Sequence, residues 1–302
     1  MNTMLDPDKY EKIFKKFYFF FLAIFVIFIL FLAVKFGTRI FVYDSFGIPT
    51  DSMQPTLMPG DMVYADKLTF GARLYDNLDS AAKSRNPATT RVGGFGKIKH
   101  NDVLIFNFPV PYSWSKIEFN IRRVYCKRCV ALPGDTISIV NGFFKNSSTA
   151  DTLGYIPAQK RLSLIPEDML ADGIRRAYPF DSVNYNWTIK NFGPLYIPAR
   201  GSRVALDTVN YLLYRLAVEY ETGLRLTVRD SVLYLGNEPV SEYVFTENYY
   251  FTAGDNAENS QDSRYWGLLP EKHIIGIAKS ILYSKSKVND KFRRDRLLKK
   301  IE

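Results

Sequence analysis

The feature that most constrains this chain is an unbroken apolar stretch close to its N-terminus. Residues 17–34 read FYFFFLAIFVIFILFLAV and contain no charge, no glycine and no proline. As an α-helix they would span about 27 Å, nearly the thickness of a bilayer core, and flanking lysines could extend that reach. A buried core helix of this length would show polar positions on one face. We therefore expect residues 17–35 to form a membrane anchor.

The flanks of this stretch predict its orientation. A cleaved secretory signal would have an apolar region of about 7–15 residues that ends at small residues. Here residues 34–37 read VKFG, a poor cleavage site, so we expect an uncleaved anchor. Four lysines precede the stretch, and only Lys35 and Arg39 follow it closely. The positive-inside tendency then predicts a single-pass protein of the cytoplasmic (inner) membrane, with residues 1–16 in the cytoplasm and the remaining chain on the exported side.

Composition excludes several other classes of protein. With 47% apolar residues among 302, the chain is too apolar for a disordered protein, and two cysteines cannot build a disulfide scaffold. Its two histidines, His100 and His273, argue against a histidine-based metal site, and we expect no metal or organic cofactor. The formal charge is +9, but residues 285–302 hold eight Lys/Arg against three Asp/Glu. Because the excess is local, we expect no nucleic-acid partner.

Two segments are candidates for contact with the lipid bilayer. The basic tail at residues 285–302 is either a solvated, frayed chain end or a strip that binds anionic lipid. The aromatic segment at residues 109–117 contains Tyr112 and Trp114, residue types that favour the membrane interface. It would either enter the lipid or form a buried loop.

The body of the chain has the pattern of short strands, rich in Val, Ile, Tyr and Phe and separated by Gly, Pro and Asn. Helices are expected at residues 166–177 and at 208–221, the second after a cap at Asp207. Residues 80–100 are predicted to be a loop and residues 133–135 a turn. The expected strands are 61–68, 102–109, 122–132, 136–140, 224–228, 231–235 and 249–252.

Four short motifs stand out behind the anchor. They are IPTDSMQPTL at 48–57 with PGD at 59–61, DVLIFNFP at 102–109, YCKR at 125–128 with LPGD at 132–135, and GDN at 254–256 followed by Ser260 and by DSRYWG at 262–267. Any one of them could arise by chance, but four in this order behind an anchor form a specific pattern.

In order and content these motifs resemble the sequence boxes of bacterial type I signal peptidases, also called leader peptidases. The motifs lie between residues 48 and 267, and the anchor extends the resemblance to residue 17. It implies a membrane-bound serine endopeptidase that removes N-terminal signal peptides from exported preproteins, cutting after small residues at Ala-x-Ala type sites. It also implies a mainly β fold, with a signal-peptidase-like catalytic core at residues 45–140 and 246–284 that is interrupted by an inserted α/β region at 141–245.

The resemblance also implies roles for individual residues. Ser52 corresponds to the nucleophile and Lys127 to the general base. Thr50 corresponds to the hydroxyl that completes the oxyanion hole with the Ser52 N–H, and Ser260 to a serine that hydrogen-bonds the lysine. Further residues correspond to a structural ion pair, Asp262 with Arg264, and to the substrate pocket, Phe46, Ile48, Met53, Leu57, Tyr125 and Cys126.

The residue chemistry of Lys127 agrees with such a role. A serine hydroxyl is a poor nucleophile until a base takes its proton, and a lysine with its ordinary pKa of about 10.4 is almost fully protonated at pH 7. Desolvation must lower that pKa by roughly 2–3 units. Residues 124–130 are largely apolar and read as a strand, so that Lys127 could be buried on one face while Arg128 is solvated on the other. An arginine could not replace the lysine, because it does not deprotonate.

Other interpretations remain open at this point. One is a catalytically inactive, membrane-anchored binding protein of the same fold, and another is a Ser/Lys protease with a different substrate, such as a self-cleaving regulator. Cys126 and Cys129 form a C-x-x-C pattern, but positions three apart on a strand face opposite sides, so we expect no redox function.

Overall fold

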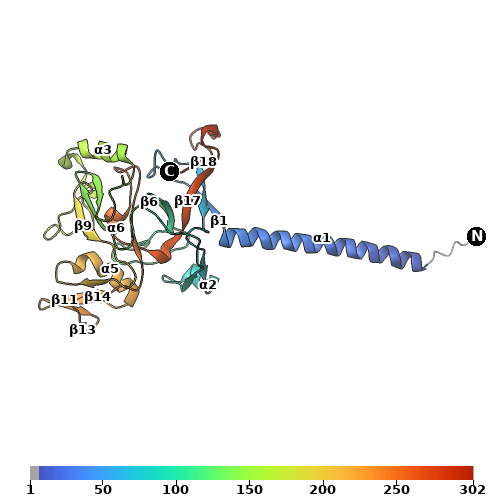
Figure 1. Cartoon of the computed structure of the whole chain (residues 1–302), viewed down its shortest axis with the longest axis horizontal. Helices are drawn as coiled ribbons and strands as arrows, with labels where there is room; N and C mark the ends of the chain where they lie inside the picture. Colours follow the sequence, from blue (N-terminus) through green and yellow to red (C-terminus); the bar gives the residue numbers. More distant parts are fainter. Residues whose placement is uncertain (1–6, 302) are drawn as a thin grey trace, which may run out of the picture.

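The computed structural model describes residues 7–301 and begins with one long helix. Helix α1 (Pro7–Phe41) projects as a single rod from the β-rich body (Figure 1), and most of its residues from 10 to 41 are exposed. Within the described residues, its segment Tyr10–Phe41 is the one helical stretch long and apolar enough to cross a membrane. The helix begins earlier than the apolar stretch because its charged start is also helix-compatible, with Glu11 and Lys15 paired at 2.6 Å one turn apart. The predicted apolar N-terminal helix is confirmed.

The body is built on one curled antiparallel sheet. Its strand order is β1-β2-β17-β5-β6-β15-β16. Strand β18 pairs with Ser280 and Ile281 of β17, beyond the residues of β17 that pair with β5. The longest strand, β17, changes register against both β2 and β5, and such bulges bend a sheet. The strands of this sheet are β1 (Tyr43–Gly47), β2 (Asp61–Asp66), β5 (Val103–Asn107), β6 (Val124–Ala131), β15 (Tyr249–Ala253), β16 (Leu269–Pro270), β17 (Ile274–Ser284) and β18 (Lys299–Lys300).

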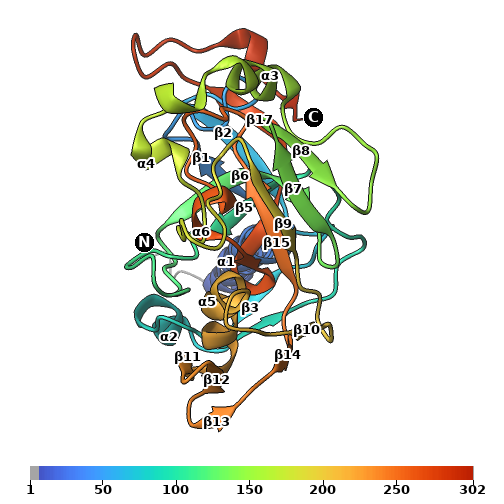
Figure 2. The ribbon, with the colours of Figure 1, turned by 90° about the vertical axis from the view of Figure 1, so that its left-hand side faces the viewer.

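Smaller sheets and short helices surround the curled sheet. In Figure 2, α3 lies at one end of the body, α5 and β11–β14 lie at the opposite end, and β7, β8 and β9 run beside β15. The small sheets are β3 (Arg73–Tyr75) with β4 (Thr89–Arg91); β7 (Thr136–Val140) with β8 (Phe143–Asn146) and β9 (Phe192–Tyr196); β10 (Arg203–Ala205) with β14 (Glu242–Val244); and β11 (Leu226–Arg229), β12 (Val232–Leu235) and β13 (Glu238–Pro239). The helices are α2 (Leu78–Lys83), α3 (Ile156–Leu164), α4 (Asp172–Arg175), α5 (Tyr211–Thr222) and α6 (Ser263–Trp266), with 3-10 turns η1 (Glu167–Met169), η2 (Glu271–His273) and η3 (Arg294–Arg296).

The mainly β fold is confirmed, and each expected strand coincides with an observed one. The helix expected at 208–221 is α5, which begins later because the Asp207 carboxylate accepts the N–H groups of Val209 and Asn210 in a turn before the helix. The helix expected at 166–177 is wrong, since that segment contains only η1 and the single turn α4.

The helix of that region is α3, one segment earlier. Its first turn contains a proline, which is tolerated there because its missing N–H would have no partner in any case. It ends at Ile165, whose extended backbone is the conformation that a following proline favours. The loop expected at 80–100 is also only partly right, since it holds the end of α2 and strand β4.

Two hydrophobic clusters occupy the two sides of the sheet. The larger joins the sheet to the helices and strands of residues 141–245, so that Leu213 and Ala217 of α5 share a core with Phe251 of β15 and Ile274 of β17. The smaller cluster lies beneath the loop between β1 and β2. It contains Ile48, Met53, Leu57, Val63, Ala65, Val103, Ile105, Ala278 and Ile281. Much of residues 141–245 therefore shares the larger core, and Ala158, Leu162, Leu170 and Ile189 form a further small cluster with Ala257. The assignment of this range as an inserted region stays a prediction.

Candidate active site

Ser52 lies in the loop that connects β1 to β2. Two backbone hydrogen bonds close the loop at its base, from Ile48 N to Asp61 O (2.8 Å) and from Gly60 N to Ile48 O (2.9 Å). Met53 and Leu57 form one helical turn and are both buried, which anchors the loop to the smaller cluster. Gly60 has a φ of +96°, and a Cβ there would meet a backbone carbonyl at 1.9 Å. We call residues 48–60 the Ser52 loop.

Lys127 approaches Ser52 from the neighbouring part of the sheet. It lies on β6, its residue is 3% exposed, and its Nζ is hydrogen-bonded to the Ser52 Oγ. Burial lowers the pKa of the Lys127 amine below the ordinary value of a lysine, and the nearby Asp262 carboxylate offsets this only in part. The Lys127 amine is therefore easier to deprotonate than an ordinary lysine, and it lies in hydrogen-bond contact with the serine hydroxyl whose proton it could accept.

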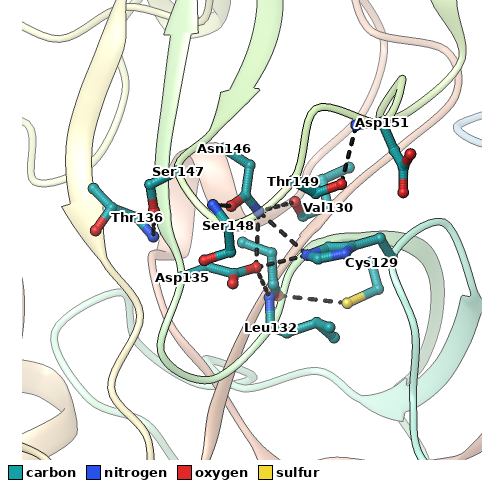
Figure 3. A network of polar contacts seen from close by, with 12 residues as sticks. Cys129, Val130, Leu132, Asp135, Thr136, Asn146, Ser147, Ser148, Thr149 and Asp151 are labelled. Atoms are coloured by element: carbon teal, nitrogen blue, oxygen red, sulfur yellow. Dashed lines mark hydrogen bonds and ion pairs between the residues drawn. The ribbon is translucent and has the colours of Figure 1, made fainter.

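The two histidines are occupied elsewhere. His100 Nε2 lies 2.7 Å from the Asp135 carboxylate, and His273 Nδ1 lies 3.1 Å from the carbonyl oxygen of Asn107. Asp135 also accepts from Leu132 N and from the Asn146 side chain, both at 2.8 Å (Figure 3). This network closes the expected turn at 133–135. Lys127 is thus the titratable base that contacts Ser52.

A third segment holds the far side of the Ser52 loop. The Asn256 N–H donates to the Ser52 carbonyl at 3.1 Å. Gly254 packs so closely that a Cβ would lie 2.5 Å from that same carbonyl oxygen and 2.1 Å from the Ser260 Oγ. The Asp262 carboxylate accepts the Gly254 N–H at 2.9 Å. A side chain at position 254 would therefore push the segment away from the loop.

Asp262 and Arg264 are joined by a buried two-point ion pair. The guanidinium donates to the carboxylate through Nε at 2.8 Å and Nη2 at 2.7 Å, and both residues are fully buried. Burial raises the pKa of Asp262, but the charge and hydrogen bonds of Arg264 outweigh it, so that the pKa is lowered overall. The expected pairing of these two residues is thus present.

Ser260 and Thr50 are close to the site, but neither makes the contact that the sequence predicts. Ser260 is buried beside Asp262, whose pKa its hydroxyl helps to lower, and no hydrogen bond joins it to Lys127 in the described chain. Thr50 is exposed and lines the cavity in front of Ser52. The orienting role of Ser260 and the oxyanion role of Thr50 stay predictions.

The expectation that Arg128 is exposed to solvent is wrong. Its guanidinium is not solvated but buried, and it donates to the Asp255 carboxylate through Nε and Nη2, both at 2.7 Å. It also reaches Asn101 O at 2.9 Å and the Thr56 hydroxyl at 3.4 Å. Strand β6 is covered on both faces, so the residue after Lys127 cannot point to solvent. Asp255 of the Gly-Asp-Asn motif is the acidic partner of Arg128, and nothing in the sequence indicated that these two residues would pair.

A cavity of about 600 Å³ opens in front of Ser52 and Lys127. Five of the six expected pocket residues line it, namely Phe46, Ile48, Met53, Tyr125 and Cys126. Leu57 does not, because it is fully buried in the cluster below the Ser52 loop. Polar side chains of Asp51, Arg122, Asn259 and Gln261 also face the cavity.

Neither cysteine is paired, and the described residues contain no cluster of side chains that could bind a metal ion. Cys126 and Cys129 are both free, and they pack in different hydrophobic clusters. Burial raises the pKa of the Cys126 thiol to about 12, so that it stays protonated. Among residues 7–301, no group of three or more His, Cys, Asp or Glu side chains could hold a metal ion.

A serine hydrogen-bonded to a buried lysine, behind an apolar N-terminal helix, is the arrangement expected of a membrane-anchored serine peptidase. Residues 20–150 and 222–283 match the family described as signal peptidase, peptidase S26. The chain belongs to this family, in which a Ser/Lys dyad is typical, and it is a serine peptidase. The unmatched residues 151–221 lie within the range predicted to be inserted.

Bacterial relatives agree with the family. The chain is 27% identical over 296 residues to signal peptidase I of Buchnera aphidicola from Acyrthosiphon pisum, an alignment that spans 94% of this chain and 81% of that protein. It is 26% identical over 261 residues to signal peptidase I of the Baizongia pistaciae subspecies, spanning 81% and 71% of the two chains. It is also 26% identical over 275 residues to signal peptidase I of Pseudomonas aeruginosa, spanning 88% and 70%.

Proposed function

We propose that this protein removes N-terminal signal peptides from exported preproteins, cutting after small residues at Ala-x-Ala type sites. The observation that carries the proposal is the hydrogen bond between the buried Lys127 amine and the Ser52 hydroxyl at the cavity. Family membership supports the same activity.

In the proposed mechanism Ser52 Oγ attacks the peptide carbonyl while Lys127 Nζ takes its proton. Lys127 then returns that proton to the leaving amine. The Ser52 N–H and the Thr50 hydroxyl would hold the oxyanion, a contribution that is often the largest in acyl transfer. Water hydrolyses the resulting ester, again with Lys127 as the base. Asp262 and Arg264 would act indirectly, by holding the Gly254 backbone against the loop.

The cavity supports a preference for small side chains. The apolar side chains of Ile48, Met53 and Cys126 line the cavity together with the rings of Phe46 and Tyr125, and the Tyr125 ring centroid lies 5.7 Å from Lys127 Nζ. An apolar pocket discriminates mainly by volume, at about 1–3 kcal/mol for a methylene group. We infer that Cys126 limits the size of the substrate residue next to the cut.

The anchor supports a position at the membrane surface. Only Val42 separates the end of α1 from β1, so the body cannot move far from the end of the helix. We propose that residues 1–16 are cytoplasmic and that the catalytic body lies on the exported side of the inner membrane. Tyr112 and Trp114 are half exposed while Ile117 is buried, which supports partial entry of segment 109–117 into lipid.

The test uses the full chain in mild detergent with a preprotein that carries an Ala-x-Ala site. We expect the parent to release the mature N-terminus and Ser52→Ala and Lys127→Ala to fail. Lys190→Met is the matched control, because it also removes a buried lysine. The Lys190 amine, however, donates to the carbonyls of Ser163 and Ile165 and, in the described chain, makes no contact with Ser52.

Each alternative predicts another result. A parent that is folded but does not cleave or react with an acylating probe would favour an inactive binding protein. Cleavage only within its own chain would favour a self-cleaving regulator. Cleavage that survives Ser52→Ala would show that the nucleophile is wrongly assigned.

A further inference from the structure

The basic tail is part of the folded body. Strand β18 pairs with β17, and the Ile301 N–H donates to Lys279 O at 3.0 Å. In Figure 1 the C-terminus accordingly lies back against the body beside β17. Arg296 is 5% exposed, whereas Arg294, two positions earlier, is exposed. The expectation of a frayed end is therefore wrong for this part of the tail, and a buried arginine needs a structural explanation.

Arg296 binds the end of the Ser52 loop. Its Nε and Nη2 donate to the Asp61 carboxylate at 3.0 and 2.5 Å, and Nη2 also donates to the Thr56 carbonyl at 2.8 Å. Thr56 belongs to the helical turn that directly follows Ser52. Asp61 in turn accepts the Met58 N–H at 2.7 Å, so one ion pair holds two points of the loop.

Other tail residues bind the same loop. Arg293 Nη1 donates to Pro59 O at 3.0 Å, the Lys285 N–H donates to Gly60 O at 3.0 Å, and Lys287 Nζ donates to Pro49 O at 3.1 Å. The tail therefore contacts both ends of the Ser52 loop. The opposite side of the loop is held by Asn256, through its N–H to the Ser52 carbonyl.

The electrostatics make Arg296 the central contact. Burial raises the pKa of Asp61, but hydrogen bonds from Arg296, from the Met58 N–H and from Ser284, together with the charge of Arg296, lower that pKa overall. The Arg296 guanidinium binds the carboxylate through two hydrogen bonds of fixed geometry, whereas a lysine would supply the positive charge without that geometry. Removal of Arg296 would leave a buried carboxylate with Arg293 as the remaining cation, 3.9 Å away.

We propose that the C-terminal tail is a clamp that positions Ser52 against Lys127, and that Arg296 is its main positioning residue. Lys127 is fixed in the sheet, whereas Ser52 lies in a loop whose position depends on what holds its two sides. A misplacement of about 1 Å in a catalytic group can cost about 10²-fold in rate. The proposal rests on the proposed function, because it assumes that Ser52 is the nucleophile.

The test compares Arg296→Ala with Arg294→Ala in the full chain, in detergent and in liposomes with anionic lipid. Both variants lose one positive charge from the same turn. We expect Arg296→Ala to lower kcat at least tenfold with KM within threefold, to slow acylation of Ser52 by a probe, and to be partly rescued by Arg296→Lys. Arg294→Ala should match the parent in both media. Assays run about 10 °C below the lowest Tm keep every variant folded.

Three outcomes would overturn the clamp. Arg296→Ala with a lowered Tm but an unchanged kcat would make the contact purely structural. Equal losses in both variants, seen only in liposomes, would assign the tail to lipid binding. A rise in KM without a change in kcat would place the tail in substrate binding. Failure of the proposed function is distinguishable, because the parent itself would then not cleave the preprotein, or Ser52→Ala would cleave it as well as the parent does.

Discussion

Two buried lysines in this molecule have different partners. Lys127, on strand β6 of the curled sheet, is hydrogen-bonded to the Ser52 hydroxyl. Lys190, in the region predicted to be inserted, donates to the carbonyls of Ser163 at 3.1 Å and Ile165 at 2.5 Å, at the C-terminal end of α3. Carbonyls at a helix C-terminus favour a cation, whereas a hydroxyl is a group from which a neutral amine can take a proton. Burial alone therefore does not identify a lysine as a candidate base, and the hydrogen-bond partner of the amine is the distinguishing feature.

Replacing each lysine by arginine keeps the positive charge but removes the ability to act as a base. Lys127→Arg should lower kcat/KM by roughly 10²–10⁴-fold, because a guanidinium cannot act as a base. Lys190→Arg should keep cleavage near the parental rate. Preprotein cleavage by the two variants measures both effects, and comparable activity in Lys127→Arg would remove Lys127 from the mechanism.

The pH dependence of cleavage gives the next largest effect. Burial lowers the pKa of Lys127, and only the neutral amine can take the Ser52 proton. As pH falls below that lowered pKa, kcat/KM should drop about tenfold per unit, and it should reach a plateau well below the ordinary pKa of lysine, about 10.4. A rate that still rises steeply above pH 10 would contradict a desolvated base. Lys190→Met should leave the profile unchanged.

The pocket prediction tests whether the cavity beside Lys127 receives the substrate. Cys126→Trp should fill the space next to Ser52 and reduce cleavage of an Ala-x-Ala substrate by tens of times or more. Reaction of Ser52 with a small acylating probe should fall much less. Normal preprotein cleavage by the variant would refute the assignment of this pocket, and circular dichroism would show whether the fold is intact.

The structural lysine should affect stability rather than rate. Lys190→Met leaves two carbonyls without their donor, and we expect the free energy of unfolding to fall by about 1–3 kcal/mol. The kcat at a temperature where the variant is folded should stay within twofold of the parent. Thermal or urea unfolding of the two proteins measures the loss, and a matching fall in kcat would link residues 141–245 to catalysis.

The smallest expected effect concerns the aromatic segment. Trp114 is 47% exposed and packs edge to face against Phe108. If segment 109–117 enters lipid, liposomes should shift Trp114 emission to shorter wavelength by a few nanometres in a variant whose other tryptophans are replaced by phenylalanine. Tyr234, remote in the chain and replaced by tryptophan in the same background, would serve as the control. An unshifted Trp114 would count against lipid contact.

Much of the site could be predicted from sequence because its signals are local. Each feature can be recognised from a short segment of the sequence. These features are the apolar stretch at 17–34, the strand around Lys127 and the motif around Ser52. The helix at α3 was missed because a proline in its first turn looks like a break. Leu57 was placed in the pocket because it follows Ser52 in the same motif, whereas the helical turn directs it into the core.

The apolar N-terminal helix and the strand-rich body could be predicted from the order of residue types alone, and the pairing of a serine with a lysine followed from the resemblance of the motifs to a known family. Which side chains are buried, and against which partners, could be seen only in the folded chain. The fold buries Arg128 against Asp255 and Arg296 against Asp61, partners 127 and 235 positions away in the chain. The physical reason is that periodicity and turn chemistry encode local conformation, while burial and ion pairing depend on segments that meet only when the sheet has closed.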